Sequence, residues 1–265
     1  MDPTGLLLSR TPAVAESSNR MEPGFATGLQ ASAWGSTMAD ARDIARLKRV
    51  MLIRVPAALV VLLAIWLTAA GTVWYWQAWA ITGTFLVLLF LVGTYYLRVD
   101  PDFLVHRMQA REKEAAQKRV VRIWTPLTIL LILLPAFDTR FGWSQVPAPA
   151  CVAGLLLMLA AYAFVIWVFR TNRYASRTIE IQAGQTVISS GPYSVVRHPM
   201  YAAQFVMFPA LLVALGSWWA AAGSALIIVP LVLRILNEEE VLRRELSGYA
   251  DYCARVRYRL LPGVW

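Results

Sequence analysis

Long apolar runs alternate with short polar connections along this chain, and six of the runs have the character of membrane helices. The predicted spans are residues 50–71, 77–97, 122–137, 149–169, 200–215 and 218–236. A helix needs about 20 apolar residues to cross the hydrocarbon core of a bilayer. The third and fifth runs are shorter than this, so we expect each to be tilted, extended by its flanks, or partly re-entrant. The pattern predicts an all-α fold, a polytopic membrane helix bundle of about six spans.

The composition supports the same fold class. Of the 265 residues, 58% are hydrophobic and only 15% are charged, whereas an ordinary globular domain carries about 25% charged residues. A soluble domain of this length could not bury all of these apolar runs in one core. The composition therefore indicates an integral, multi-pass membrane protein that is in contact with membrane lipids.

Basic residues alternate between the two ends of the predicted spans. Seven lie before or at the start of the first span, seven in the second connection, four in the fourth connection, and five in the tail after Asn237. The alternate connections hold only Arg140, and Arg234 lies inside the last span. Because cytoplasmic loops carry the excess of Lys and Arg, we predict that both termini are cytoplasmic.

The net charge of +9 must also be weighed as a sign of nucleic-acid binding. The basic residues flank apolar spans instead of following one polar face, and membrane orientation with anionic head groups explains such loops. We therefore predict no nucleic-acid partner. Cys151 and Cys253 stand alone in the sequence, so their spacing predicts neither a disulfide framework nor a metal site.

Three regions follow from these patterns. Residues 1–40 are rich in Ala, Ser, Gly and Thr without sustained periodicity, which predicts a disordered tail. Residues 41–169 hold four plain membrane helices, and the polar chemistry gathers in residues 170–265. No internal repeat relates the two halves, which argues against a transporter built from two related halves.

The first polar cluster precedes the fifth predicted span, at Gly191-Pro192-Tyr193 and Arg197-His198-Pro199-Met200-Tyr201. Pro199 suits the first turn of a helix, where its missing N–H costs nothing, so His198 is expected at or next to the N-cap. The first-turn amides then face the preceding loop and favour an anionic group. The alternative interpretation is that Arg197 and His198 only hold the helix at the level of the head groups.

The second polar cluster ends the last predicted span, at Arg234 and the acids 238–240. Charges at membrane depth are costly and mark a functional site or a paired network. The turn at Gly216-Ser217 predicts an antiparallel hairpin that brings His198 and Glu238 to the same membrane level. The alternative is a simple ion pair between Arg234 and Glu238, with the other acids in solvent.

The tail adds a third cluster beyond Gly248. Tyr249, Tyr252 and Val256 are spaced to share one helical face, and Arg255 and Arg259, four residues apart, are spaced to share another. The alternative interpretation is a basic amphipathic tail that lies on anionic lipid.

These motifs occur in a fixed order: Gly-Pro-Tyr with Arg-His-Pro-x-Tyr, then Arg-x-x-x-Glu-Glu-x-x-Leu, then Tyr-x-x-Tyr with Arg-Val and Pro. Together they resemble the isoprenylcysteine carboxyl methyltransferase family, which is related to the phospholipid N-methyltransferases. The resemblance covers about residues 170–265. It implies an S-adenosylmethionine site formed by the last helix hairpin and the tail. Consistent with this, no Gly-x-Gly-x-x-Gly motif follows a strand pattern.

The resemblance also implies individual site residues. The cofactor-binding candidates are Tyr193, His198, Pro199, Tyr201, Glu238, Glu239 and Tyr252. Glu240 leaves the register of the acidic pair open by one residue. Arg234 and Arg255 are the candidate catalytic residues, because a cation can orient an acceptor carboxylate. The segment 256–259 reads Val-Arg-Tyr-Arg where the family commonly has Val-Pro-Arg, which is a departure from its pattern.

The predicted function is therefore that of a membrane methyltransferase of the carboxyl O-methyltransferase type. The resemblance suggests a prenylcysteine-type carboxylate, reached from the bilayer, as the lipophilic acceptor, and related enzymes act on lipid amines or small thiols. Two other hypotheses stay open: an NADPH-dependent enzyme similar to sterol reductases, and a non-enzymatic lipid-binding or scaffold protein.

Overall fold

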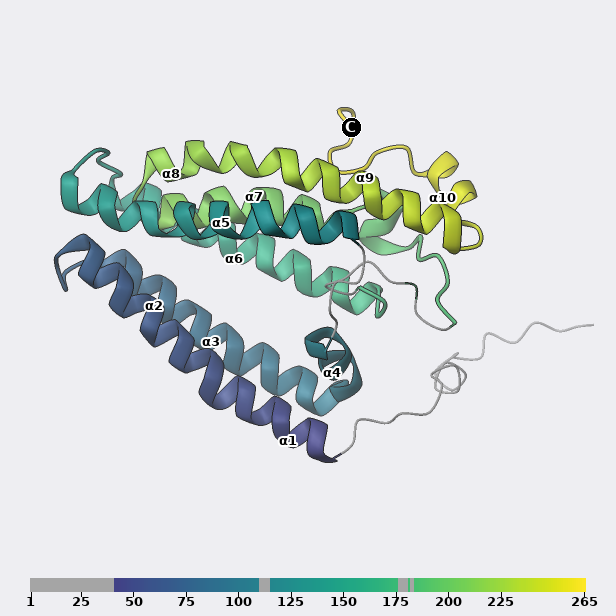
Figure 1. Ribbon diagram of the computed structural model, residues 1–265, viewed down its shortest axis with the longest axis horizontal. Helices are drawn as coiled ribbons and strands as arrows, with labels where there is room; N and C mark the ends of the chain where they lie inside the picture. The colour runs from purple at the N-terminus through teal and green to yellow at the C-terminus, as the bar shows by residue number, and fades with distance from the viewer. Residues whose placement is uncertain (1–40, 110–114, 176–180, 182–183) are drawn as a thin grey trace, which may run out of the picture. The chain divides into compact units, whose positions relative to one another are not determined.

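The computed structural model describes residues 41–109, 115–175, 181 and 184–265, which lie within one contact unit, Ser36–Trp265. The tail predicted over residues 1–40 lies outside the described residues. Within the described ranges the chain forms helices and connections and no strand (Figure 1).

The helices follow one another with short connections. Their bounds are α1 Ala41–Arg49, η1 Val50–Arg54, α2 Val55–Ala70, α3 Trp76–Val99, α4 Pro101–Gln109, α5 Ala115–Phe141, α6 Ala148–Thr171, η2 Gly191–Ser194, α7 Pro199–Ala214, α8 Trp218–Gly223, η3 Ser224–Ile227, α9 Ile228–Glu245 and α10 Tyr249–Arg255. The short segment η1 is a π-helical turn that joins α1 to α2.

Five of the six predicted spans lie in helical stretches that are long and apolar enough to cross a membrane. They are Arg42–Ala70, Trp76–Val99, Val120–Phe141, Ala148–Thr171 and Trp218–Glu245. The third span is longer than its apolar run because flanking residues extend the helix. The fifth predicted span is α7, an apolar helix of only 16 residues. The all-α membrane bundle is confirmed.

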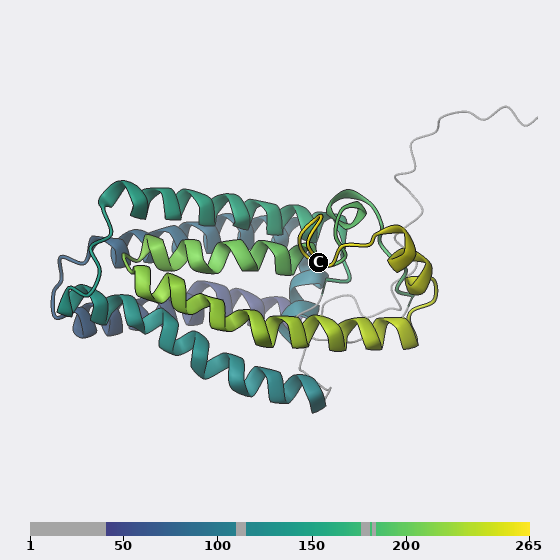
Figure 2. The ribbon, with the colours of Figure 1, turned by 90° about the horizontal axis from the view of Figure 1, so that it is seen from above.

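The predicted hairpin in the C-terminal region is present. Gly216 adopts a φ of 86°, a left-handed backbone conformation that residues with a Cβ rarely adopt, and so permits the tight reversal after α7. Ser217 then caps α8 by accepting a hydrogen bond from the Ala220 amide. The chain returns through η3 and α9, and Figure 2 shows α9 running back alongside α7.

A buried carboxylate holds this turn to the end of α5. Asp138 is fully buried and accepts hydrogen bonds from the Ser144 amide at 2.6 Å, from the Ser144 hydroxyl, and from the Ser217 hydroxyl. A buried acid is tolerated where donors satisfy its oxygens. These bonds therefore tie the hairpin turn to α5 and the loop that follows it.

Helices α6 and α7 form the most extensive helix–helix contact among the described residues, and one glycine permits their approach. A Cβ on Gly154 would lie 2.8 Å from the Ala210 carbonyl oxygen and 2.9 Å from the Ala214 amide nitrogen. Small residues at helix contacts allow backbones to approach in membranes. This contact sets α7, which carries His198 at its start, against the rest of the bundle.

Candidate functional site

The start of α7 is built as the sequence predicted. His198 is the N-cap residue and Pro199 the first residue of the helix. The backbone amides of Arg197 and His198 donate to the carbonyl oxygens of Tyr258 and Arg259, each at 2.9 Å. The C-terminal tail therefore runs beside the loop that enters α7 and fixes its position.

The predicted meeting of the two polar clusters is confirmed. The His198 Nε2 lies 3.3 Å from Glu239 Oε1 and its Nδ1 lies 4.0 Å from Glu238 Oε1. Both ends of the hairpin thus meet, although 40 residues separate His198 from Glu238 in the sequence. The alternative in which Arg197 and His198 only touch head groups does not hold, because their side chains are 5% and 4% exposed.

Glu239 lies behind this meeting point and acts as the centre of a buried ion cluster. Its side chain is 4% exposed, with Arg197 Nε at 3.2 Å from Oε1 and Arg259 Nε at 3.1 Å from Oε2. Arg243 approaches Oε2 at 3.8 Å from a half-exposed position. A buried charge needs such partners to offset its desolvation, so Glu239 joins α7, α9 and the tail.

Glu238 belongs to a different network, which faces a pocket. The Arg234 Nε donates to the Tyr201 hydroxyl at 2.8 Å, and that hydroxyl donates to Glu238 Oε2 at 2.6 Å. Tyr201, which is 5% exposed, therefore links Arg234 to Glu238. The three neighbouring acids lie in different surroundings. Glu238 lines the pocket, Glu239 is buried behind it, and Glu240 is exposed.

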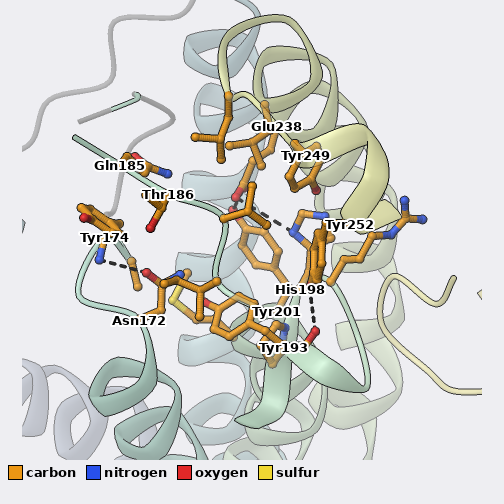
Figure 3. A pocket seen from close by; sticks show the side chains of 18 of the residues that line it. Asn172, Tyr174, Gln185, Thr186, Tyr193, His198, Tyr201, Glu238, Tyr249 and Tyr252 are labelled. Carbon is orange, nitrogen blue, oxygen red and sulfur yellow. Dashed lines mark hydrogen bonds and ion pairs between the residues drawn. The ribbon is translucent and has the colours of Figure 1, made fainter. Parts of the chain in front are cut away.

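The pocket, named here the polar pocket, lies between the start of α7, the end of α9, α10 and the segments around Asn172 and Thr186 (Figure 3). Its lining is Asn172, Tyr174, Ala175, Gln185, Thr186, Val187, Ile188, Tyr193, Arg197, His198, Pro199, Met200, Tyr201, Arg234, Glu238, Leu242, Leu246, Tyr249 and Tyr252. Six of the seven predicted cofactor-binding residues are in this lining, and Glu239 is the exception. Its volume is about 110 Å³.

Three tyrosines form one wall of the polar pocket. Burial raises the pKa of Tyr193 to about 12 and also raises the pKa of Tyr249 and of Tyr252, so all three phenols stay neutral near neutral pH. The Tyr252 hydroxyl donates to the Tyr193 carbonyl oxygen at 2.7 Å and holds α10 against η2. Tyr249 is 4% exposed, and its hydroxyl has no hydrogen-bond partner among the described residues. An unsatisfied buried donor costs about 1–3 kcal/mol, so a ligand that pairs with it is favoured.

Arg255 does not join the site. It lies exposed at the end of α10 and is not part of the lining of the polar pocket. The prediction that Arg255 and Arg259 share a helical face is wrong, because α10 ends at Arg255 and the tail leaves the helix there. Arg259 instead pairs with Glu239 and lies 5.0 Å over the ring of Trp265.

Sequence reasoning missed the wall that follows α6. Asn172, Tyr174, Gln185 and Thr186 line the polar pocket but belong to no motif. One local signal exists, because Asn172 directly follows an apolar span and its side chain accepts from the Tyr174 amide at 2.9 Å, as an Asx turn does. Nothing comparable marks Gln185 or Thr186.

Two further cavities continue from the polar pocket toward the apolar helices. A junction pocket of about 290 Å³ shares Met200, Tyr201 and Arg234 with the polar pocket. An apolar cavity of about 500 Å³, between α5, α7 and the α8–α9 stretch, shares Trp124 and Gln204 with the junction pocket. The Tyr201–Arg234 contact therefore lies between the polar pocket and the junction pocket, which in turn borders the apolar cavity.

The comparison with known proteins agrees with this architecture. Residues 149–247 match the family described as phospholipid methyltransferase. The matched stretch contains α6 to α9 and both polar clusters, and it ends before α10. No curated protein matches the chain. The family match indicates a membrane methyltransferase and supports the group to which the phospholipid and the isoprenylcysteine enzymes both belong.

Proposed function

We propose that this protein uses S-adenosylmethionine to methylate a lipophilic acceptor drawn from the bilayer, with a prenylcysteine-type carboxylate as the acceptor group. The observation that carries the proposal is the chain from Arg234 through Tyr201 to Glu238. Glu238 lines the polar pocket, and Tyr201 and Arg234 line both the polar pocket and the junction pocket. The junction pocket borders the apolar cavity through Trp124 and Gln204, so these residues connect a cofactor-like environment to a route from the bilayer.

The residues of the polar pocket fit the parts of this cofactor. The Glu238 carboxylate can accept from an amino group or from ribose hydroxyls, and the Tyr249 hydroxyl, which no described residue pairs with, offers a further bond. Tyr193 and Tyr252 with the neighbouring leucines give an aromatic and apolar wall for a purine base. The first-turn amides that follow Pro199 favour a carboxylate.

Glu239 receives a different role from the one the resemblance implied. Because it is buried behind His198 and pairs with Arg197 and Arg259, we assign it as a positioning residue that holds the imidazole in the pocket wall. His198 in turn lies 5.7 Å from the Tyr201 ring, centroid to centroid, and limits where that ring can go.

The pocket must open to admit a nucleoside-sized ligand. Its volume of about 110 Å³ is below the range of about 300–1,000 Å³ that is usual for small-molecule sites. We propose that the wall formed by Tyr174, Gln185 and Thr186 moves outward on binding, because these residues belong to a connection and not to a packed helix.

The chemistry needs alignment more than acid–base work when the acceptor is a carboxylate. When bound, S-adenosylmethionine supplies a methyl carbon already activated by its sulfonium. A carboxylate is ionised near neutral pH, so no proton has to be removed. Arg234 borders the junction pocket and can orient the carboxylate through charge-assisted bonds. The apolar cavity accommodates the hydrocarbon tail and keeps water away from the reacting groups.

A lipid amine is the second candidate acceptor, because the matched family is that of the phospholipid methyltransferases. An amine is protonated near neutral pH and must lose a proton before it can attack. Its methylation should therefore rise with pH in the neutral range, whereas methylation of a carboxylate should stay flat there. The pH profile of the initial rate separates the two acceptors.

The direct test is the transfer of labelled methyl groups from S-adenosylmethionine by the purified full chain. Prenylcysteine analogues, phosphatidylethanolamine and lipophilic thiols are offered in parallel, and a pyridine-nucleotide titration tests the reductase hypothesis. We expect Glu238→Gln to weaken cofactor binding and Arg234→Ala to lower the rate with a carboxylate acceptor. Glu240→Gln, an exposed neighbour on the same helix, is the matched control. Cofactor affinities of His198→Ala and Glu238→Gln equal to that of the unmodified protein would remove the proposed site.

A further inference from the structure

We propose that a separate cavity, between the α1–α2 stretch, α3, α4 and α6, binds an anionic membrane lipid whose head group is held by Arg107. This cavity, named here the lateral cavity, has a volume of about 270 Å³ and shares only Arg107 with the junction pocket. The binding proposal does not depend on the proposed enzymatic function.

The lateral cavity is elongated, with an apolar stem and a polar end, as a site for an amphiphilic lipid would be. Leu88 and Tyr96, which mark its extent along α3, are eight residues apart, or about 12 Å at the helical rise of about 1.5 Å per residue. The stem is apolar, with Val55 and Val92 among its walls. The polar side chains of the lining are Arg107, Tyr96 and Tyr162, and none of the described residues that line it carries a carboxylate.

The polar end contains an unsatisfied donor. Tyr96 is 6% exposed, and its hydroxyl has no hydrogen-bond partner among the described residues. A phosphate or ester oxygen of a lipid can accept from it. The guanidinium of Arg107 lies 4.3 Å above the ring centroid of Phe169, which holds its plane in place. Guanidinium groups recognise phosphate oxygens through charge-assisted bonds.

The charge of the surroundings favours an anionic lipid over a zwitterionic one. Arg46, Lys48 and Arg49 lie in the last turn of α1, which packs against α4, the helix that carries Arg107. Arg98 lies in the last turn of α3. Basic pockets between membrane helices on the cytoplasmic side bind anionic head groups, and the alternation of basic residues predicts this end to be cytoplasmic.

Two contacts connect the lateral cavity to the polar pocket. The Arg107 Nη1 donates to the Ala175 carbonyl oxygen at 3.0 Å, and Arg173 pairs with Asp100 at 2.8 Å. Asp100 also caps α4 by accepting from the Phe103 amide. A lipid that fixes Arg107 therefore steadies the segment at Ala175, which lines the polar pocket. This consequence, unlike lipid binding itself, rests on the proposed function.

The test uses the full chain in phosphatidylcholine nanodiscs without acceptor, with phosphatidylglycerol added as the anionic probe. Native mass spectrometry after release counts the lipids that stay bound. We expect phosphatidylglycerol to be retained over phosphatidylcholine, and Arg107→Ala to reduce that preference about five-fold, the equivalent of about 1 kcal/mol for one basic residue.

Two valine variants test the cavity independently of Arg107. Val92→Phe fills the stem, and we expect it to abolish retention, whereas Val87→Phe on the exposed face of α3 should leave retention unchanged. Equal retention of both lipids, or retention that survives both Arg107→Ala and Val92→Phe, overturns the proposal.

Cofactor affinity measured in the same nanodiscs is a second readout. Tighter binding with phosphatidylglycerol in the unmodified chain, and no change in Val92→Phe, supports the link to the polar pocket. Selective lipid retention without any cofactor binding would refute the proposed function and this link while leaving the lipid site intact.

Discussion

Removal of the Glu239 carboxylate tests how the two polar clusters are held together. In Glu239→Ala, the Arg197 guanidinium loses a partner 3.2 Å away while its side chain remains 5% exposed. His198 loses a contact at 3.3 Å in an equally buried position. Removing one partner of a buried ion pair costs about 3–5 kcal/mol, because the remaining charge is left uncompensated.

The exposed partners reduce this cost. The side chains of Arg259 and Arg243 are 26% and 49% exposed and can be hydrated once Glu239 is gone. We therefore expect the lower end of the range, about 3 kcal/mol. At about 2–4 °C per kcal/mol for a domain of this size, the melting temperature should fall by about 6–12 °C.

The measurement is thermal unfolding of the purified protein in nanodiscs, followed by intrinsic tryptophan fluorescence. Glu240→Ala removes an exposed acid from the same helix and should change stability by no more than about 0.5 kcal/mol. The assignment of Glu239 as a positioning residue fails if Glu239→Ala leaves the melting temperature unchanged and still abolishes cofactor binding. That combination would mean direct contact with the cofactor.

Four other substitutions test the fold and the pocket. Gly154→Ala should destabilise the protein by about 1–3 kcal/mol, because the new methyl would lie 2.8 Å from the Ala210 carbonyl oxygen. A methyl group at Gly83 would have no atom within 4 Å. Gly83→Ala should therefore stabilise α3 by up to about 1 kcal/mol in the same unfolding assay. Tyr249→Phe removes a buried hydroxyl that has no hydrogen-bond partner among the described residues, so the stability of the ligand-free protein should stay the same or rise. The affinity for the cofactor, measured by calorimetry, should fall about five- to ten-fold. An unchanged affinity would show that this hydroxyl does not contact the ligand. Burial raises the pKa of Tyr193 from 10.0 to about 12, so as the pH rises the folded state keeps the phenol proton longer than the unfolded state does. The contribution of Tyr193 to the free energy of unfolding is therefore complete below pH 10 and is lost between pH 10 and 12. Unfolding measured across that range should show a smaller alkaline loss in Tyr193→Phe, and an identical loss would contradict the shift.

Hydropathy and charge along the chain were sufficient to predict the membrane bundle. A run of apolar residues long enough to cross a bilayer has few stable alternatives to a helix, because the backbone must satisfy its own hydrogen bonds there. Pro199 after His198, and Gly216 before Ser217, are local signals whose conformational preferences are fixed by the residues themselves. For this reason the N-cap, the turn and the convergence of His198 with the acids were predictable from the sequence.

Only the tertiary structure separated the roles of the acids. Neighbouring residues on a helix point about 100° apart, since one turn takes 3.6 residues, so Glu238 and Glu239 must face different surroundings. Which of them faces the polar pocket depends on where α7 and the tail pack around α9, and no local pattern contains that information. The same holds for Arg259, which reaches Glu239 because the tail leaves α10 at Arg255.

The pocket residues that follow α6 could not be predicted from the sequence either. Asn172 and Gln185 both line the polar pocket together with residues at the start of α7. Their residue types are ordinary for a polar connection, and only contacts distant in sequence bring them to the pocket. The sequence by itself determined the helices and which of their ends meet, since these follow from local physics and the bilayer. The tertiary packing decided which side chains face the ligand.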